Sequence, residues 1–176
     1  RLFSVSLLCG CISTDCDYDR FFATENYEYV RHISLFRNKI EAQSREAAVK
    51  VTAYDMFGNK IGGSGAYITH NGKHYILTAA HVVEGSSIAM VDGTREIIIA
   101  DVVYVDRDSD LALLSIAGMA SRKPIPWKVS KEIDVGSKLV YSGYPNMLSL
   151  LTIKGEIAGF YKQSIVAHSY VWRGAS

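Results

Sequence analysis

The chain has 176 residues, and its 19 basic and 18 acidic side chains leave a formal net charge of +1. This length suits one ordinary domain, and the near balance of charge argues against a nucleic-acid-binding surface, which needs a clear basic excess. Apolar residues make up 48% and charged residues 21% of the chain, which provides for a sizeable core and excludes global disorder. The composition also excludes collagen, a coiled coil and a multi-span membrane protein, and an aromatic share of 11% favours β structure.

Residues 1–16 have the pattern of an export signal. Arg1 precedes an apolar run, residues 2–8, that is too short to span a membrane. A basic start followed by apolar and small residues is typical of the end of a secretory signal. The ending Leu8-Cys9-Gly10-Cys11 also resembles a bacterial lipobox, which implies lipidation of Cys11 and attachment to a membrane. An ordinary apolar strand or a buried anchor is the alternative. We therefore expect a secreted or periplasmic protein, with a lipid anchor under the lipobox interpretation, from a bacterium or a bacteriophage.

All three cysteines lie in this first segment, at Cys9, Cys11 and Cys16. The globular part of the chain therefore has no internal disulfide, whichever compartment it occupies. The three thiols lack a nearby fourth ligand, so we expect no metal site there.

Residues 17–46 are expected to form a helical lead-in to the domain. Between residues 24 and 47, apolar side chains recur at steps of three and four, which is the pattern of one face of an amphipathic helix. These side chains are Val30, Ile33, Phe36 and Ile40. Packing on the domain is the simpler role for this helix, and docking to an assembly partner is the other.

From Ala48 onward the pattern becomes that of short strands. Val49, Val51 and Ala53 alternate with polar residues, as in a half-buried strand, and residues 57–60 have the composition of a hairpin turn. Further strand candidates are 66–69, 74–77, 87–91, 97–105, 111–116, 138–142, 151–160 and 164–172. Many short strands at close spacing predict an all-β barrel or sandwich. Residues 117–127, which contain two prolines, are expected to connect two halves.

Three polar residues stand out by their surroundings. His81 follows an apolar strand and two alanines, whose small side chains let other groups approach the imidazole. Asp110 directly precedes an apolar strand, so its carboxylate is expected to be partly buried where that strand begins. Ser176 follows Gly174 by two residues, and glycine permits a tight turn that points successive backbone N–H groups the same way.

Each of these residues also has an ordinary explanation when it is taken singly. A histidine after a strand is more often structural, and an aspartate before a strand is usually a turn former, a role for which Asp106 and Asp108 compete. The tripeptide Gly174-Ala175-Ser176 is common by chance. The order His81, Asp110, Ser176 nevertheless matches the His…Asp…Ser order of chymotrypsin-type serine proteases.

Residues 47–176 resemble the trypsin-like peptidases, most closely their HtrA/Deg-like bacterial branch. The segments that carry this resemblance are residues 63–68, 76–83, 105–114, 135–136, 143–145 and 155–157. Thr78-Ala79-Ala80-His81 is the most specific of them, and Asp110-Leu111-Ala112-Leu113-Leu114 supports it. The resemblance implies two antiparallel six-stranded β-barrels of chymotrypsin type, the first at about 47–117 and the second from about 125. It places the triad in the cleft between them.

The resemblance also implies a role for each residue. His81 would take the proton of the Ser176 hydroxyl and return it to the leaving amine, for which a reference pKa near 6.5 is suitable. Asp110 would hold the other ring N–H and fix the tautomer. The backbone N–H groups of Gly174 and Ser176 would form the oxyanion hole. No metal or cofactor is needed.

The same resemblance places His168 and Tyr170 along the wall of the pocket for the substrate side chain. No acidic residue occurs between Glu156 and Ser176, so a preference for Arg or Lys gets no support from this stretch. We predict a serine endopeptidase that acts on protein or peptide substrates. The alternative is a catalytically inactive module of the same fold, with a structural or binding role in a larger assembly or at the cell surface.

Overall fold

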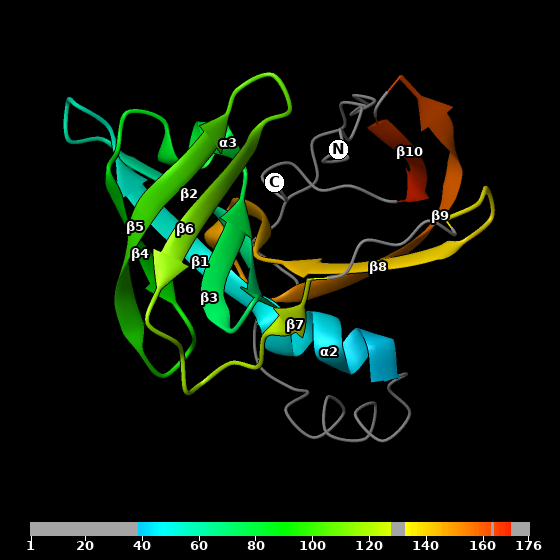
Figure 1. Ribbon diagram of the computed structural model, residues 1–176, viewed down its shortest axis with the longest axis horizontal. Coiled ribbons are helices and arrows are strands. Elements are labelled where there is room, and N and C mark those ends of the chain that lie inside the picture. Colours follow the sequence, from blue (N-terminus) through cyan, green and yellow to red (C-terminus); the bar gives the residue numbers. More distant parts are fainter. Residues whose placement is uncertain (1–38, 128–132, 163, 170–176) are drawn as a thin grey trace, which may run out of the picture.

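Six antiparallel strands of the first half close on themselves to form a barrel (Figure 1). The structure is a computed structural model that describes residues 39–127, 133–162 and 164–169. Neighbouring strands follow the order β1-β4-β5-β6-β3-β2, and β2 also pairs with β1, which closes the ring. The six strands are β1 (Ala48–Tyr54), β2 (Lys60–His70), β3 (Lys73–Thr78), β4 (Ile88–Asp92), β5 (Ile97–Asp106) and β6 (Leu111–Ile116). The barrel interpretation is thus confirmed for this half.

The barrel interior is built by the period-two alternation that the sequence displays. Val49 and Val51 on β1 are fully buried, and so are Ile76 on β3, Val91 on β4 and Leu114 on β6. Successive side chains of a strand point to opposite faces, so every second residue enters the barrel. The predicted strands agree with the observed ones to within about three residues at their ends, except that the candidate at 66–69 is the last part of a longer strand, β2, which begins at Lys60.

The expected hairpin turn joins β1 to β2, where Tyr54 pairs with Lys60. The Asp55 carboxylate accepts hydrogen bonds at 2.8 Å from the backbone N–H groups of Phe57 and Asn59 and from the Asn59 side-chain amide. Gly58 has a φ of +80°, which glycine adopts without strain. The bonds from Asn59 lower the pKa of Asp55 below its ordinary value.

The second half of the described chain is a three-stranded antiparallel sheet in the order β10-β9-β8 (Figure 1). Its strands are β8 (Lys138–Gly143), β9 (Leu151–Tyr161) and β10 (Ser164–Ser169). A 3₁₀ turn, η3 (Pro145–Met147), lies between β8 and β9. The described residues form an open sheet here, and the closed second barrel stays a prediction.

The helix α2 (Lys39–Ala47) leads directly into β1 and packs against the second sheet. The Ser44 hydroxyl donates to the Ser142 hydroxyl at 2.9 Å, and Arg45 donates to the Thr152 hydroxyl at 2.7 Å. The expected lead-in helix is thus confirmed over 39–47, and the rest of it lies outside the described residues.

The segment expected to be a plain connector holds a short strand, β7 (Ile125–Pro126), so that expectation was incomplete. β7 runs parallel to β2, with Ile68 opposite Ile125, and the Trp127 N–H donates to the carbonyl of Thr69 at 2.8 Å. The strand was not predicted because this segment contains two prolines, and proline has no N–H to donate to a sheet.

Several predictions fall outside the described residues. They concern the signal-like segment 1–16 with Cys11, and the C-terminal residues Tyr170, Gly174 and Ser176. Within the described ranges, no helix is long and apolar enough to cross a bilayer.

Candidate active site

His81 lies on α3 (Ala80–Val83), a single helical turn that directly follows β3. Ala80, Val82 and Val83 are buried in the barrel core, while the His81 side chain is 52% exposed. Three apolar residues thus anchor the turn and leave the histidine facing solvent. This pattern fixes the imidazole at the rim of the barrel, where another molecule can reach it.

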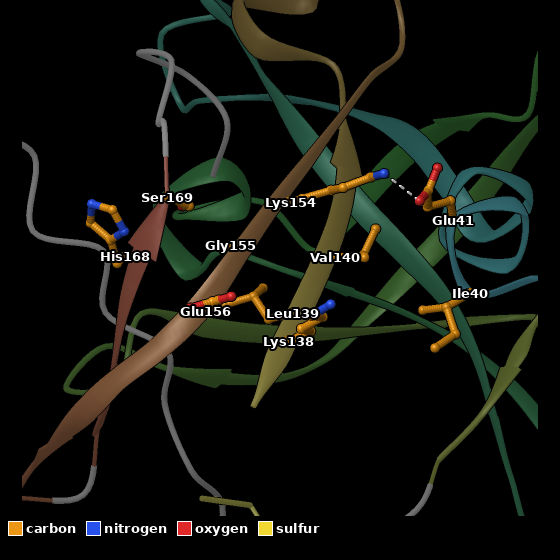
Figure 2. A pocket seen from close by; sticks show the side chains of 10 residues that line it. All are labelled: Ile40, Glu41, Lys138, Leu139, Val140, Lys154, Gly155, Glu156, His168 and Ser169. Atoms are coloured by element: carbon orange, nitrogen blue, oxygen red, sulfur yellow. Dashed lines mark ion pairs between the residues drawn. The ribbon is translucent and has the colours of Figure 1, made fainter. Parts of the chain in front are cut away.

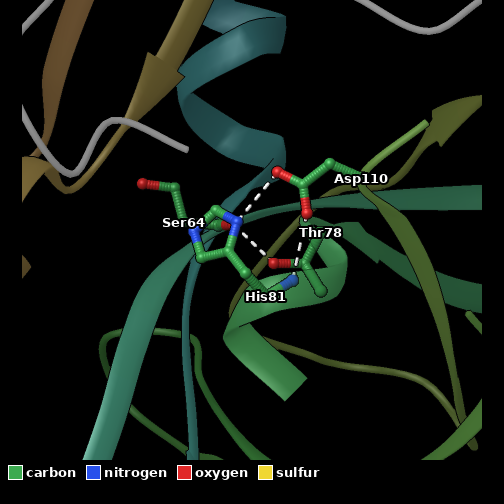
Figure 3. Close-up of polar contacts among 4 residues, drawn as sticks. All are labelled: Ser64, Thr78, His81 and Asp110. Atoms are coloured by element: carbon green, nitrogen blue, oxygen red, sulfur yellow. Dashed lines mark hydrogen bonds and ion pairs between the residues drawn. The ribbon is translucent and has the colours of Figure 1, made fainter. Parts of the chain in front are cut away.

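Asp110 ends the turn between β5 and β6 and is bonded twice to His81 (Figure 3). Its Oδ1 accepts the backbone N–H of His81 at 3.0 Å, and its Oδ2 lies 2.8 Å from Nδ1 of the His81 ring. Asp110 has a φ of +51°, in the left-handed region that aspartate tolerates better than most residues. The two contacts hold the carboxylate on both the backbone and the side chain of the histidine.

The neighbouring Asp106 has the ordinary role that the sequence left open for Asp110. The Asp106 carboxylate accepts the backbone N–H groups of Asp108 at 3.0 Å and Ser109 at 3.3 Å, so Asp106 is the turn former. Asp110 is the aspartate that meets the imidazole.

The His81–Asp110 pair can direct a proton. A carboxylate is an acceptor, so the proton between the two groups belongs on Nδ1, which leaves the lone pair of Nε2 free to accept a proton. The side chains are 52% and 51% exposed, and such exposed pairs contribute little to stability. The pair therefore serves mainly to orient the imidazole, and it contributes little to the stability of the fold.

Two residues to which the sequence analysis gave no role lie beside this pair (Figure 3). The Thr78 side chain, 5% exposed, donates from its hydroxyl to the backbone carbonyl of Ser64 at 2.8 Å. The Ser64 hydroxyl accepts the backbone N–H of Tyr144 at 2.8 Å, a contact between β2 and the residue after β8. The available signal was a buried threonine three residues before His81 and a serine between two glycines.

His168 lies on β10, away from the His81–Asp110 pair, and lines a cavity of about 650 Å³ between α2 and the second sheet (Figure 2). The Glu41–Lys154 ion pair, with an N–O distance of 2.6 Å, forms one part of its wall. The other lining residues are Ile40, Lys138, Leu139, Val140, Gly155, Glu156 and Ser169. The structure thus brings together His81 and Asp110 and places His168 elsewhere, on the second sheet.

Among residues 39–127, 133–162 and 164–169, no three His, Cys, Asp or Glu side chains gather as a metal site would require.

Comparison with known proteins gives consistent matches over most of the chain. The family model of the trypsin-like peptidase domain matches residues 63–176. The chain is 30% identical over 128 residues to the serine protease Do-like HtrA of Bacillus subtilis, covering 68% of this chain and 28% of that protein. It is 32% identical over 105 residues to the chloroplastic protease Do-like 1 of Arabidopsis thaliana, covering 57% of this chain and 24% of that protein. The chain thus spans about a quarter of the length of these curated relatives.

Solved structures share the fold. The active form of the Rv3671c protease of Mycobacterium tuberculosis aligns with a TM-score of 0.64 at 22% identity, over 81% of this chain and 68% of that one. The serine endoprotease of Yersinia pestis aligns with a TM-score of 0.64 at 24% identity, over 77% of this chain and 49% of that one. At these identities the likeness establishes the fold and nothing more.

Proposed function

The chain belongs to the trypsin-like peptidase domain family, in its HtrA branch, and from this premise we propose that it is a serine endopeptidase. The observation that carries the proposal is the double contact of Asp110 with the backbone and the ring of His81. Proteins or peptides are the substrates that this family membership implies.

The proposed mechanism uses the lone pair on Nε2 of His81, which stays available when Asp110 holds the proton on Nδ1. A neutral serine hydroxyl is a poor nucleophile, so His81 removes its proton as Ser176 attacks the substrate carbonyl. Asp110 holds the Nδ1–H and stabilises the imidazolium that forms. The backbone N–H groups of Gly174 and Ser176 bind the oxyanion. His81 then gives the proton to the leaving amine, and water resolves the acyl-enzyme by the same route.

Further parts of the proposal concern how the chain is organised. We take residues 47–176 as the peptidase domain, with the first barrel at about 47–117 and the second from about 125, of which β8, β9 and β10 would be the first strands. His168 and Tyr170 are proposed to line the pocket for the substrate side chain. Residues 1–16 are proposed as an export signal with a lipid attached at Cys11, and 17–46 as a lead-in that can dock a partner. The protein would then be secreted or periplasmic, with or without the lipid anchor.

A fluorophosphonate probe followed by intact-protein mass spectrometry tests the proposal. We expect one adduct on Ser176 in the native chain and none in Ser176→Ala or His81→Ala. His70→Ala is the matched control, because His70 is an exposed histidine at the end of β2 and should label like the native chain. If the native chain is folded and forms no adduct, the proposal of enzyme activity is wrong. That result would support the alternative, an inactive module with a structural or binding role.

A further inference from the structure

We infer that Ser64 is a positioning residue of the proposed active site, which ties the second sheet to the barrel strand that supports His81. This inference rests on the proposed function. Ser64 bonds in two directions: its carbonyl oxygen accepts the Thr78 hydroxyl, and its own hydroxyl accepts the Tyr144 N–H, both at 2.8 Å. Figure 3 shows the Ser64 hydroxyl pointing away from Thr78, so the two bonds face opposite sides of the residue.

The barrel side of this link leads to the catalytic pair. Ser64 is on β2, and its neighbour Gly65 pairs with Thr78 at the end of β3. His81 follows three residues later on α3, whose other three residues are buried in the barrel. The Thr78 hydroxyl bond adds a side-chain contact to the backbone pairing at this point. A fixed Ser64 carbonyl therefore helps to fix where α3 begins.

The second side of the link is Tyr144, which is held by two barrel residues and by one residue of the segment between β6 and β7. The Tyr144 side chain is buried, with 6% exposed, and its hydroxyl accepts from the Arg122 guanidinium. The Lys50 ammonium on β1 lies 5.1 Å from the centre of its ring and donates to the Met147 carbonyl at 3.1 Å. The Ser64 hydroxyl holds the backbone N–H. The residue that follows β8 is thus held to the barrel by its backbone N–H and its ring, and to the segment between β6 and β7 by its phenol group.

The strand that carries Ser64 is also shaped for this close contact. A Cβ added at Gly62 would lie 2.7 Å from the Met147 sulfur, so a side chain at residue 62 would require the Met147 side chain to move. A Cβ at Gly65 would lie 2.7 Å from a methyl group of Ile76. Glycines thus flank the close contacts of this strand, and the Ser64 hydroxyl is one of the polar groups that join the barrel to the second sheet.

The link matters because the proposed triad is divided between the two halves. His81 and Asp110 belong to the barrel, whereas Ser176 follows β10 in the chain. β8, β9 and β10 are hydrogen-bonded to one another, so a shift at the end of β8 is passed along the sheet. A misplacement of about 1 Å between reacting groups can cost about 10²-fold in rate. The Ser64–Tyr144 bond is placed to prevent such a shift.

The rate of Ser176 labelling by a fluorophosphonate, measured from pH 5 to 9 well below the unfolding temperature, tests this inference. We expect Ser64→Ala to lower the limiting rate by about 10- to 100-fold. The midpoint of the pH profile should not move, because the His81–Asp110 bonds stay intact. Ser64→Thr restores a hydroxyl at this position and should recover most of the rate. A loss of stability alone would lower the unfolding temperature and leave the labelling rate of the folded protein unchanged.

Ser115→Ala is the matched control, because this serine lies on β6 and makes no side-chain hydrogen bond to another described residue. It should label at the native rate. Equal rates for Ser64→Ala and the native chain would overturn the positioning role and leave the proposed function intact. Failure of Ser64→Thr to recover any rate would also overturn it. A native chain that does not label would instead overturn the proposed function, and this inference with it.

Discussion

The barrel and the three-stranded sheet differ in how each is stabilised. The barrel is closed and has a core of its own, with Val49, Val51, Ile76 and Leu114 fully buried. Among the hydrophobic side chains on the described strands of the sheet, that of Ile157 is buried, and the others are half-buried or exposed. The sheet is instead held by contacts near its β8 edge, to α2 and, through Tyr144, to the barrel.

This difference separates the two parts of the candidate site. The barrel places His81 and Asp110 by itself, since His81 lies on the helical turn after β3 and Asp110 directly precedes β6. The position of the second sheet relative to that pair depends on a few polar bonds at the junction. Chemistry and stability should therefore respond to different mutations in the two halves.

The largest expected effect is on reactivity, in Asp110→Asn. Asparagine tolerates the left-handed backbone of this position, but its amide would favour the wrong imidazole tautomer. We expect the rate of Ser176 labelling to fall by about 10⁴-fold, the loss given for this substitution in a Ser-His-Asp triad. The unfolding temperature should change little. Asp106→Asn is the control, since an asparagine can also form this turn, and a similar loss in that variant would contradict the assignment.

Leucine truncations compare the two halves directly. Leu114→Ala in the barrel core should lower the free energy of unfolding by about 2–5 kcal/mol, because it removes a fully buried side chain and leaves a cavity. Leu139→Ala on β8 should cost about 1 kcal/mol, because that side chain is half-buried and lines an open cavity. Chemical denaturation measures both. Equal losses would show that the sheet is packed as tightly as the barrel.

Acid should weaken the barrel half. Hydrogen bonds from Ser121 lower the pKa of Glu96 below its ordinary 4.5, and those from Asn59 lower the pKa of Asp55 below 3.8. A lowered carboxyl pKa stabilises the fold above the ordinary value, and this contribution is lost as the pH falls through the lowered one. We expect the unfolding temperature to fall between pH 5 and pH 3, and to fall less in Glu96→Gln. An equal fall in both proteins would contradict this origin.

Alkali should weaken the second sheet, with the smallest effect of the series. Burial raises the pKa of Tyr141 on β8 above its ordinary value of 10.0. The neutral phenol therefore stabilises the fold fully below pH 10, and this contribution is lost as the pH rises through the raised value. Between pH 9 and pH 11, Tyr141→Phe should lose less stability than the native chain in urea unfolding. Parallel losses would exclude Tyr141 as the source.

Much of the fold could be predicted from local patterns. The alternation of Val49, Val51 and Ala53 predicted β1, and Gly58 with Asn59 predicted its turn. β7 was missed because it pairs in parallel with a strand more than fifty residues away and contains a proline. The closed second barrel and Ser176 stay predictions, since the described residues include three strands of that half and end at residue 169.

The candidate site was predicted only in part. The motif around His81 and the order of the three residues pointed to the pair that the structure brings together. Ser64 and Tyr144 were not predicted to meet, because they are eighty positions apart and their bond joins two different sheets. The glycines beside Ser64 mark a close contact of its strand, but nothing in the sequence identifies Tyr144 as the partner.

The sequence by itself determined the strand periods, the turn at Asn59 and the two candidate residues His81 and Asp110, because these depend on neighbours within a few positions. Only the tertiary structure decided between Asp106 and Asp110 as the partner of the imidazole, and which residues join the barrel to the second sheet. Both depend on strand register and on bonds between remote segments. Such bonds form only in the folded protein, so the periodicity of the sequence does not predict them.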